Sequence, residues 1–267
     1  MYRQTGGQKS AEEFFNDEPI IYPHLQTANL MKGVTANTVS GMFADDKFIG
    51  SMADFSVELF KKSIADNENS LISPLSVMLA LSMTANGADN ETLSQMEAVL
   101  GGSIQMNDLN KYLYSYVKGL PSSEKSKLGI ANSIWFRDIS TLNVKPGFLQ
   151  TNADYYGAEA YKSAFNETTV TDINDWVSAN TDGMIDSILD EISSDAVMFL
   201  INAVVFDAEW ETVYDKSQVS DGIFTDINGN QQIVPFMIQR GGQKFLDDRE
   251  KSGVQERVGA ALQAVQF

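Results

Sequence analysis

The chain has 267 residues, 43% of them hydrophobic, and a formal net charge of −17. This length and hydrophobic content suit one large globular domain or at most two small ones. So acidic a chain disfavours binding to nucleic acid or to an anionic membrane surface, because both need a basic protein surface. The sequence holds no cysteine, which excludes disulfides, thiolate catalysis and cysteine-based zinc sites.

Residues 1–45 are predicted to form a mobile leader, because glycines and polar clusters interrupt them and no hydrophobic period persists. The single histidine, His24, lies in this polar stretch and is interpreted as a surface or tail residue rather than a triad member. No signal peptide is visible in Met1–Ser10, and no apolar run reaches the ~18 residues of a membrane span.

Two helices are predicted next. The first follows Asp45 and Asp46 and carries apolar residues at spacings of three and four until Lys61 and Lys62. The second begins in the segment Asn69–Ser76, with Ser73 as N-cap and Pro74 as first helical residue. It is apolar nearly all round, which predicts burial on all sides, and Asn86-Gly87 ends it.

Alternating helices and strands follow. Helical periodicity and stop signals predict helices over 91–100, 108–120 and 146–156, the last closed by Gly157, and a further helix through Ile173 that Thr169 caps. Strands are predicted over 128–136 and 158–161. Helices come first and strands mix with helices later, which favours a mixed α+β domain over a regular βαβ fold.

Residues 197–206 form a nearly continuous apolar run, which predicts a central strand with both faces covered. Asn202 is its one polar member. A buried amide without partners costs about 1–3 kcal/mol, so Asn202 must meet donors or acceptors from a neighbouring element.

A hairpin is predicted over 223–237, with Asn228-Gly229 as its tight turn. A calcium loop starting at Asp226 is rejected, because Gln231 stands where such a loop needs glycine and Met237 where it needs glutamate.

Several of these segments, collinear from about residue 48 to 238, resemble the serpin family. The resemblance is to serpins of a prokaryotic-like type. The matching stretches are Asn69–Ser76, Asn86-Gly87-Ala88, Ala131-Asn132 with Trp135-Phe136, Tyr155–Ala158, Ile173-Asn174 with Trp176-Val177, Asn202-Ala203 with Phe206 and Trp210, and Phe236-Met237. The resemblance implies an α+β fold in which the region of helices A to F packs on a mainly antiparallel central sheet.

The resemblance also implies a mechanism. A serine protease cuts an exposed reactive loop, and the loop then inserts into the sheet as an extra strand, which traps the protease. By the same resemblance, Ser73, Ser76 and Asn202 match the shutter, where the sheet parts, and Trp210 matches the breach, where insertion starts. The two serine hydroxyls are one helical turn apart and could satisfy Asn202; all four residues could equally be plain core contacts.

The resemblance covers a domain over 46–238, and residues 239–267 read as a divergent tail. The tail carries five basic and four acidic residues, whereas the rest of the chain is strongly acidic. No hinge motif of the reactive loop is found, so the chain is interpreted as lacking the reactive centre and the C-terminal strands. A frameshift, a degraded gene or a fragment would each explain this, and exposed sheet edges would then favour aggregation.

The family expectation is a secreted, monomeric inhibitor of serine proteases with no catalytic residue, metal or cofactor, although this chain is expected to be non-inhibitory as it stands. One alternative is a non-inhibitory serpin scaffold that binds another molecule, or an inactive fragment. A third hypothesis, an acidic hydrolase, would use paired carboxylates such as Asp45/Asp46 or Asp247/Asp248. Adjacent acids more often form a solvated pair that starts a helix.

Overall fold

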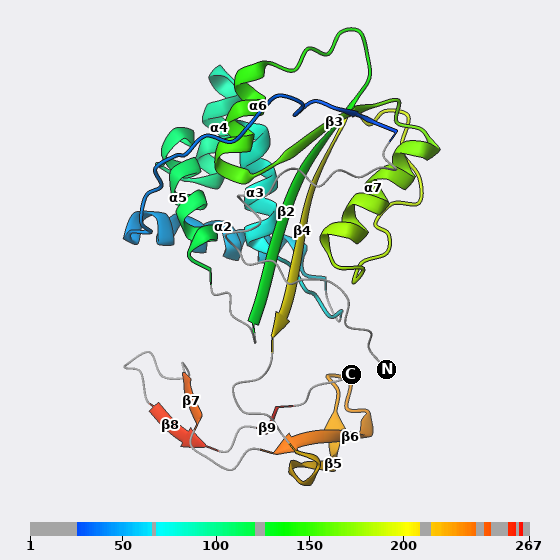
Figure 1. Cartoon of the computed structure of the whole chain (residues 1–267). Coiled ribbons are helices and arrows are strands. Elements are labelled where there is room, and N and C mark those ends of the chain that lie inside the picture. Colours follow the sequence, from blue (N-terminus) through cyan, green and yellow to red (C-terminus); the bar gives the residue numbers. More distant parts are fainter. Residues whose placement is uncertain are drawn as a thin grey trace. The chain divides into compact units, whose positions relative to one another are not determined.

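The computed structural model describes residues 26–65, 68–120, 126–208 and 215–238, and the backbone of three short strands beyond them. The chain divides into two compact units, Met1–Ala208 and Glu209–Phe267. In the first unit, a four-stranded sheet carries helices α2 to α6 on one face and helix α7 on the other (Figure 1). The predicted α+β class is confirmed.

The helices lie where the sequence places them. They are α2 (Asp46–Ser63), α3 (Pro74–Ala85), α4 (Asn90–Leu100), α5 (Met106–Lys118), α6 (Pro146–Tyr156) and α7 (Glu167–Asn180). Helix α5 begins and ends two residues earlier than predicted. It ends before Pro121 because the N–H of Gly119 bonds back to the carbonyls of the last turn.

The cap of α7 corrects the sequence prediction. Asn166, not Thr169, is the N-cap, and its side chain accepts a hydrogen bond from the backbone N–H of Thr169 at 3.2 Å. The Thr169 hydroxyl accepts in return from the backbone N–H of Asn166, also at 3.2 Å. This reciprocal capping box satisfies two backbone donors that would otherwise lack partners.

The sheet of the first unit is mainly antiparallel. It has the order β1-β3-β2-β4, formed by Ala28–Asn29, Glu159–Ser163, Ser126–Arg137 and Met198–Ala208. Strands β2 and β3 run parallel, and the other two pairs are antiparallel. In the long β2–β4 pairing, Asn132 lies directly opposite Asn202.

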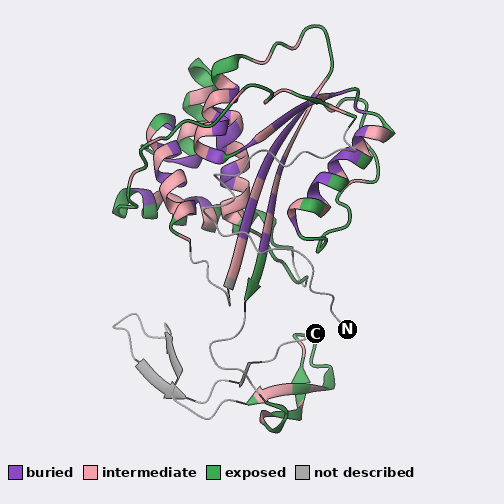
Figure 2. Cartoon of the chain, viewed as in Figure 1, coloured by how far each residue is buried: buried purple, intermediate pink, exposed green. Residues whose placement is uncertain are grey.

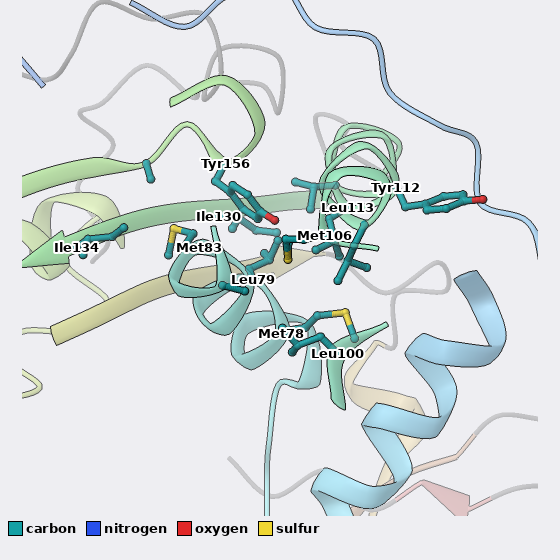
Figure 3. Packing of buried hydrophobic residues seen from close by; sticks show 14 of the residues in the cluster. Met78, Leu79, Met83, Leu100, Met106, Tyr112, Leu113, Ile130, Ile134 and Tyr156 are labelled. Carbon is teal, nitrogen blue, oxygen red and sulfur yellow. The ribbon is translucent and has the colours of Figure 1, made fainter. Parts of the chain in front are cut away.

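Two hydrophobic clusters lie on opposite faces of this sheet, because successive strand residues point to opposite sides. On one face, Met78, Leu79 and Met83 of α3 pack with Ile130 and Ile134 of β2 (Figure 3). Figure 2 shows buried residues running along β2 and β4 and through α3. On the other face, the cluster is Trp135, Tyr161, Phe165, Ile173, Trp176, Val177, Ile201 and Ala203. The middle of the apolar run of β4 is thus covered on both sides, as predicted, whereas Val197 and Phe206 at its ends are 59% and 70% exposed. The prediction of a central strand is wrong among the described strands, because β4 pairs only with β2 and lies at the edge of the sheet.

Residues 26–45 differ from the predicted mobile leader. This segment includes β1, and the backbone N–H of Leu30 donates to Ala160 of β3 at 2.8 Å. Further along, the backbone N–H of Asn37 donates to Asp154 at 2.7 Å. An extended segment held at a sheet edge by backbone bonds needs no hydrophobic period of its own, which is why the pattern missed it. Residues 1–25, including His24, lie outside the described residues.

The second unit contains the predicted hairpin, formed by β5 (Val219–Thr225) and β6 (Gln231–Ile238) after a 3₁₀ turn at Lys216–Gln218. Asp226 shapes its turn, because its carboxylate accepts from the backbone N–H groups of Asn228 and Asn230, both at 2.8 Å. Three more strands are β7 (Gln243–Leu246), β8 (Glu256–Gly259) and β9 (Leu262–Gln263); β7 pairs with β8, and β9 with β6. The boundaries at 46 and 238 stay predictions.

Asp45 offers a pH-dependent contact at the start of α2. Its carboxylate accepts from the Tyr112 hydroxyl at 2.6 Å and from the backbone N–H of Phe48 at 2.9 Å. Both bonds lower the pKa of Asp45 below its ordinary value of 3.8, and the bond from Tyr112 is the largest cause. The contribution to stability is therefore present above the ordinary pKa and is lost as the pH falls through the lowered pKa.

We expect Tyr112→Phe to raise the pKa of Asp45 toward 3.8, because the substitution removes the largest cause of the shift. Titration of the carboxyl carbons by NMR would measure it. Tyr116→Phe, which removes a hydroxyl from the same helix without touching this bond, is the control. An Asp45 pKa that is equal in the wild type and in Tyr112→Phe would contradict the assignment.

Candidate functional site

Helix α3 begins as predicted. Ser73 is its N-cap, and Pro74 is its first residue. The Ser73 hydroxyl accepts from the backbone N–H of Ser76 at 3.4 Å, and the two hydroxyl oxygens lie 2.7 Å apart in a hydrogen bond. Ser73 is exposed and Ser76 half-buried. The two serines therefore bond to each other at the exposed start of a helix whose later turns are buried.

We expect Ser73→Ala to lower the free energy of unfolding by about 1 kcal/mol, since an N-cap hydroxyl satisfies a backbone donor of the first turn. Urea denaturation followed by circular dichroism would measure the change. Ser63→Ala is the matched control: this exposed serine at the end of α2 bonds back to the Leu59 carbonyl, and its loss should stay within about 0.5 kcal/mol. Equal effects of the two substitutions would contradict the capping role.

Asn202 obtains its partner from the neighbouring strand and not from the serines. Its side-chain nitrogen donates to the side-chain oxygen of Asn132 at 2.7 Å. The expectation that the two hydroxyls satisfy Asn202 is therefore wrong. The reason is register: Asn132 lies directly opposite on β2, where side chains of an antiparallel pair come closest. The remaining oxygen of Asn202 is buried and has no donor in the part of the chain that the structure describes.

Asn132 connects this pair to the helical layer. Its side-chain nitrogen donates to the backbone carbonyl of Tyr156, the last residue of α6, at 2.9 Å. The Tyr156 hydroxyl in turn donates to the side chain of Asn110 on α5. Asn110 donates to Asn86 at 2.8 Å, at the end of α3. Burial raises the pKa of Tyr156 well above its ordinary value, so its hydroxyl stays a donor.

The result is a chain of polar contacts that runs from β4 through β2 to α6, α5 and α3, and we call it the amide chain: Asn202, Asn132, Tyr156, Asn110 and Asn86. Of these residues, only Asn202 was expected from the sequence to be a buried amide. Asn110 and Asn152 lie on the apolar faces of amphipathic helices, and that position was the available signal. Such a chain fixes the register of the strands and their distance from the helices, and parting β2 from β4 would break its first bond.

The structure describes one of the two candidate carboxylate pairs, Asp45 and Asp46. Asp45 is the N-cap of α2 and Asp46 its first residue. The pair therefore starts a helix, which is the alternative to a hydrolase carboxylate pair. Trp210 and the Asp247/Asp248 pair lie outside the described residues. Within residues 26–65, 68–120, 126–208 and 215–238, no group of three or more potential ligands could hold a metal ion. No helix of that part is long and apolar enough to cross a membrane.

A family model described as "Serpin (serine protease inhibitor)" matches residues 50–255, which is well over half of the chain. The chain belongs to the serpin family. Serpins are in general inhibitors of serine proteases and not catalysts. The chain is 30% identical to Serpin-ZX of Arabidopsis thaliana over 189 residues, 68% of this chain and 48% of that protein. It is 25% identical to human alpha-1-antichymotrypsin, covering 75% of this serpin and 49% of that one.

Solved structures agree with this assignment. The native state of tengpin, a thermophilic serpin, superposes with a TM-score of 0.79 at 58% sequence identity, over 84% of this chain and 57% of that one. A loop C-sheet serpin polymer gives a TM-score of 0.74 at 58% identity, over 81% of this chain and 57% of that one. This serpin sequence spans about half the length of the curated relatives it matches. The predicted family and fold class are confirmed.

Proposed function

We propose that this chain contributes the sheet and the helical layer of a serpin that inhibits serine proteases as a suicide substrate. In this mechanism, a reactive loop that the protease has cut adds to the sheet as a new strand. The observation that carries the proposal is the β2–β4 pair. Strand β4 is paired on one side only among the described strands, and its partner is fixed to it by the Asn132–Asn202 bond. A strand added beside β4 would gain backbone hydrogen bonds and apolar burial.

Ser73, Ser76 and Asn202 are proposed to act at the place where the sheet parts. Their support is that Ser73 and Ser76 start the helix that packs against β4, while Asn202 holds β4 to β2. Trp210 is proposed to lie where insertion begins. The proposed working domain is 46–238, and the proposed setting is a secreted monomer that meets a serine protease. As it stands, the chain is proposed to be non-inhibitory, because no stretch of it matches a reactive-loop hinge.

The test is incubation with trypsin-like, chymotrypsin-like and elastase-like serine proteases, followed by denaturing gels. We expect no covalent complex from the 267-residue chain. We expect a complex that survives denaturation from a version extended through the downstream reading frame, if that frame encodes a hinge with small residues. A covalent complex formed by the 267-residue chain would overturn the non-inhibitory assignment. An extended version that is cut without trapping any protease would favour a non-inhibitory scaffold.

A further inference from the structure

Helix α7 is attached to the sheet through a half-buried carboxylate on β3, that of Glu159. The side chain of Glu159 accepts from the indole N–H of Trp176, which lies on α7, and from the Tyr161 hydroxyl at 2.9 Å. Trp176 and Tyr161 are 1% and 2% exposed. The Tyr161 ring stacks on Trp135 of β2, with 4.4 Å between ring centroids. Glu159 therefore lies at the centre of a contact that joins β2, β3 and α7.

A second carboxylate lies one turn earlier on the same face of α7. Asp172 is four residues before Trp176, which places both on one side of the helix, and it is 2% exposed. Its carboxylate accepts from the backbone N–H of Gln26 at 3.1 Å. Asp172 thus joins α7 to the segment that leads into β1.

No cation compensates either carboxylate among the described residues. Glu159 faces the neutral donors Trp176 from α7 and Tyr161 from its own strand. The lysines that are ion-paired on β2 and β3 are engaged elsewhere, Lys127 with Asp182 and Lys162 with Asp138. A carboxylate that folding withdraws from much of its water and that meets only neutral donors loses more solvation than it regains, so its neutral form is favoured.

Asp172 faces the backbone N–H of Gln26, the side chain of Thr27 and the carboxylate of Asp175, the last of which also disfavours its charged form. Burial is the largest cause for both acids, and the pKa of each is raised above its ordinary value, 4.5 for Glu159 and 3.8 for Asp172.

We propose that Glu159 and Asp172 form an acid-strengthened clamp, so that α7 is held on the sheet more tightly at acidic pH and is released more often as the pH rises toward neutral. When α7 opens, both groups regain water and their ordinary pKa values. Protonation therefore favours the closed state. Closure weakens as the pH rises from the ordinary pKa values to the raised ones, and it is constant below and above that window. The clamp is a property of this chain and does not depend on protease inhibition.

Hydrogen exchange of the 267-residue chain, read by mass spectrometry on peptides of α7, tests the clamp, because exchange there reports local opening. We expect protection of α7, corrected for intrinsic exchange rates, to be at least about threefold higher at about pH 4.5 than at about pH 7.5. If closure raises the pKa of one acid by one unit, the equilibrium constant for closing changes by up to about tenfold across the pH window. Peptides of α3 serve as the internal reference.

Three variants make the result specific. Glu159→Gln keeps an oxygen acceptor without the charge and should reduce the pH dependence, and Glu159→Gln combined with Asp172→Asn should abolish it. Asp175→Asn is the matched control, because Asp175 is an exposed acid on the same helix, and it should retain most of the dependence. Equal protection of wild-type α7 at both pH values, higher protection at the higher pH, or a full pH dependence in Glu159→Gln would each overturn the proposal.

Discussion

Trp135→Ala is expected to lower the free energy of unfolding by about 3–5 kcal/mol, the range for truncating a large buried aromatic side chain. Trp135 is 0% exposed and packs between the sheet and α7. Its substitution removes the stacking on Tyr161 and leaves a cavity that the paired strands β2 and β3 cannot close. It also removes the indole bond to the Ser133 hydroxyl, which is 2.9 Å long. Urea denaturation at constant pH, followed by far-ultraviolet circular dichroism, would measure the loss.

Trp135→Phe is the control for this substitution. Phenylalanine keeps a ring to stack on Tyr161 and fills most of the volume, so we expect a smaller loss than for alanine. A loss below about 1 kcal/mol for Trp135→Ala would show that the face of the sheet under α7 is not the tightly packed core described above.

Asn132→Ala is expected to lower the free energy of unfolding by about 3 kcal/mol, because it leaves a buried backbone carbonyl and a half-buried amide nitrogen without their partner. The side-chain nitrogen of Asn202 loses its acceptor, and the backbone carbonyl of Tyr156 loses its donor. The methyl group that replaces the amide cannot bond to either. Asn202→Ala should cost less, since it leaves only the oxygen of Asn132 without a donor.

A double-mutant cycle separates the pair from its surroundings. The combination of Asn132→Ala with Asn202→Ala should cost less than the sum of the single substitutions by about 1 kcal/mol, because the second change removes a group that the first left unpaired. Urea denaturation of the four proteins gives their free energies of unfolding, and the differences between these give the coupling energy. Additive effects would mean that the cross-strand bond contributes nothing of its own.

Features that depend on local chemistry could be predicted from the sequence. Ser73 followed by Pro74 specifies a helix start within two residues, and the structure confirms it. The Asn228-Gly229 turn is equally local, since Gly229 adopts a positive φ of 84° that glycine tolerates. The apolar run of β4 predicted a strand with apolar clusters on both of its faces, which the structure has. The place of β4 at the edge of the sheet, among the described strands, depends on strand pairing that the run itself does not specify.

The partner of Asn202 could not be predicted in the same way. The sequence showed that a buried amide needs a partner, but several polar side chains could have met it. Which one does so depends on the pairing of β4 with β2, whose residues are about seventy positions apart. A shift of one residue in that register would have turned Asn132 to the other face of the sheet. The same reasoning applies to residues 26–45, whose order depends on contacts with distant β3 and α6.

The short strand β1 has a consequence for association between molecules. Residues 28–30 occupy the edge of β3. Among the described strands, the sheet of the first unit therefore has one long unpaired edge, along β4, and an edge of two residues at the other side. If two copies paired through their β4 edges, the long free edge of each sheet would be occupied. The two-residue edge at β1 offers too few backbone donors and acceptors for a third copy to add there. Growth by this route would stop at a twofold-symmetric pair instead of extending into a fibre.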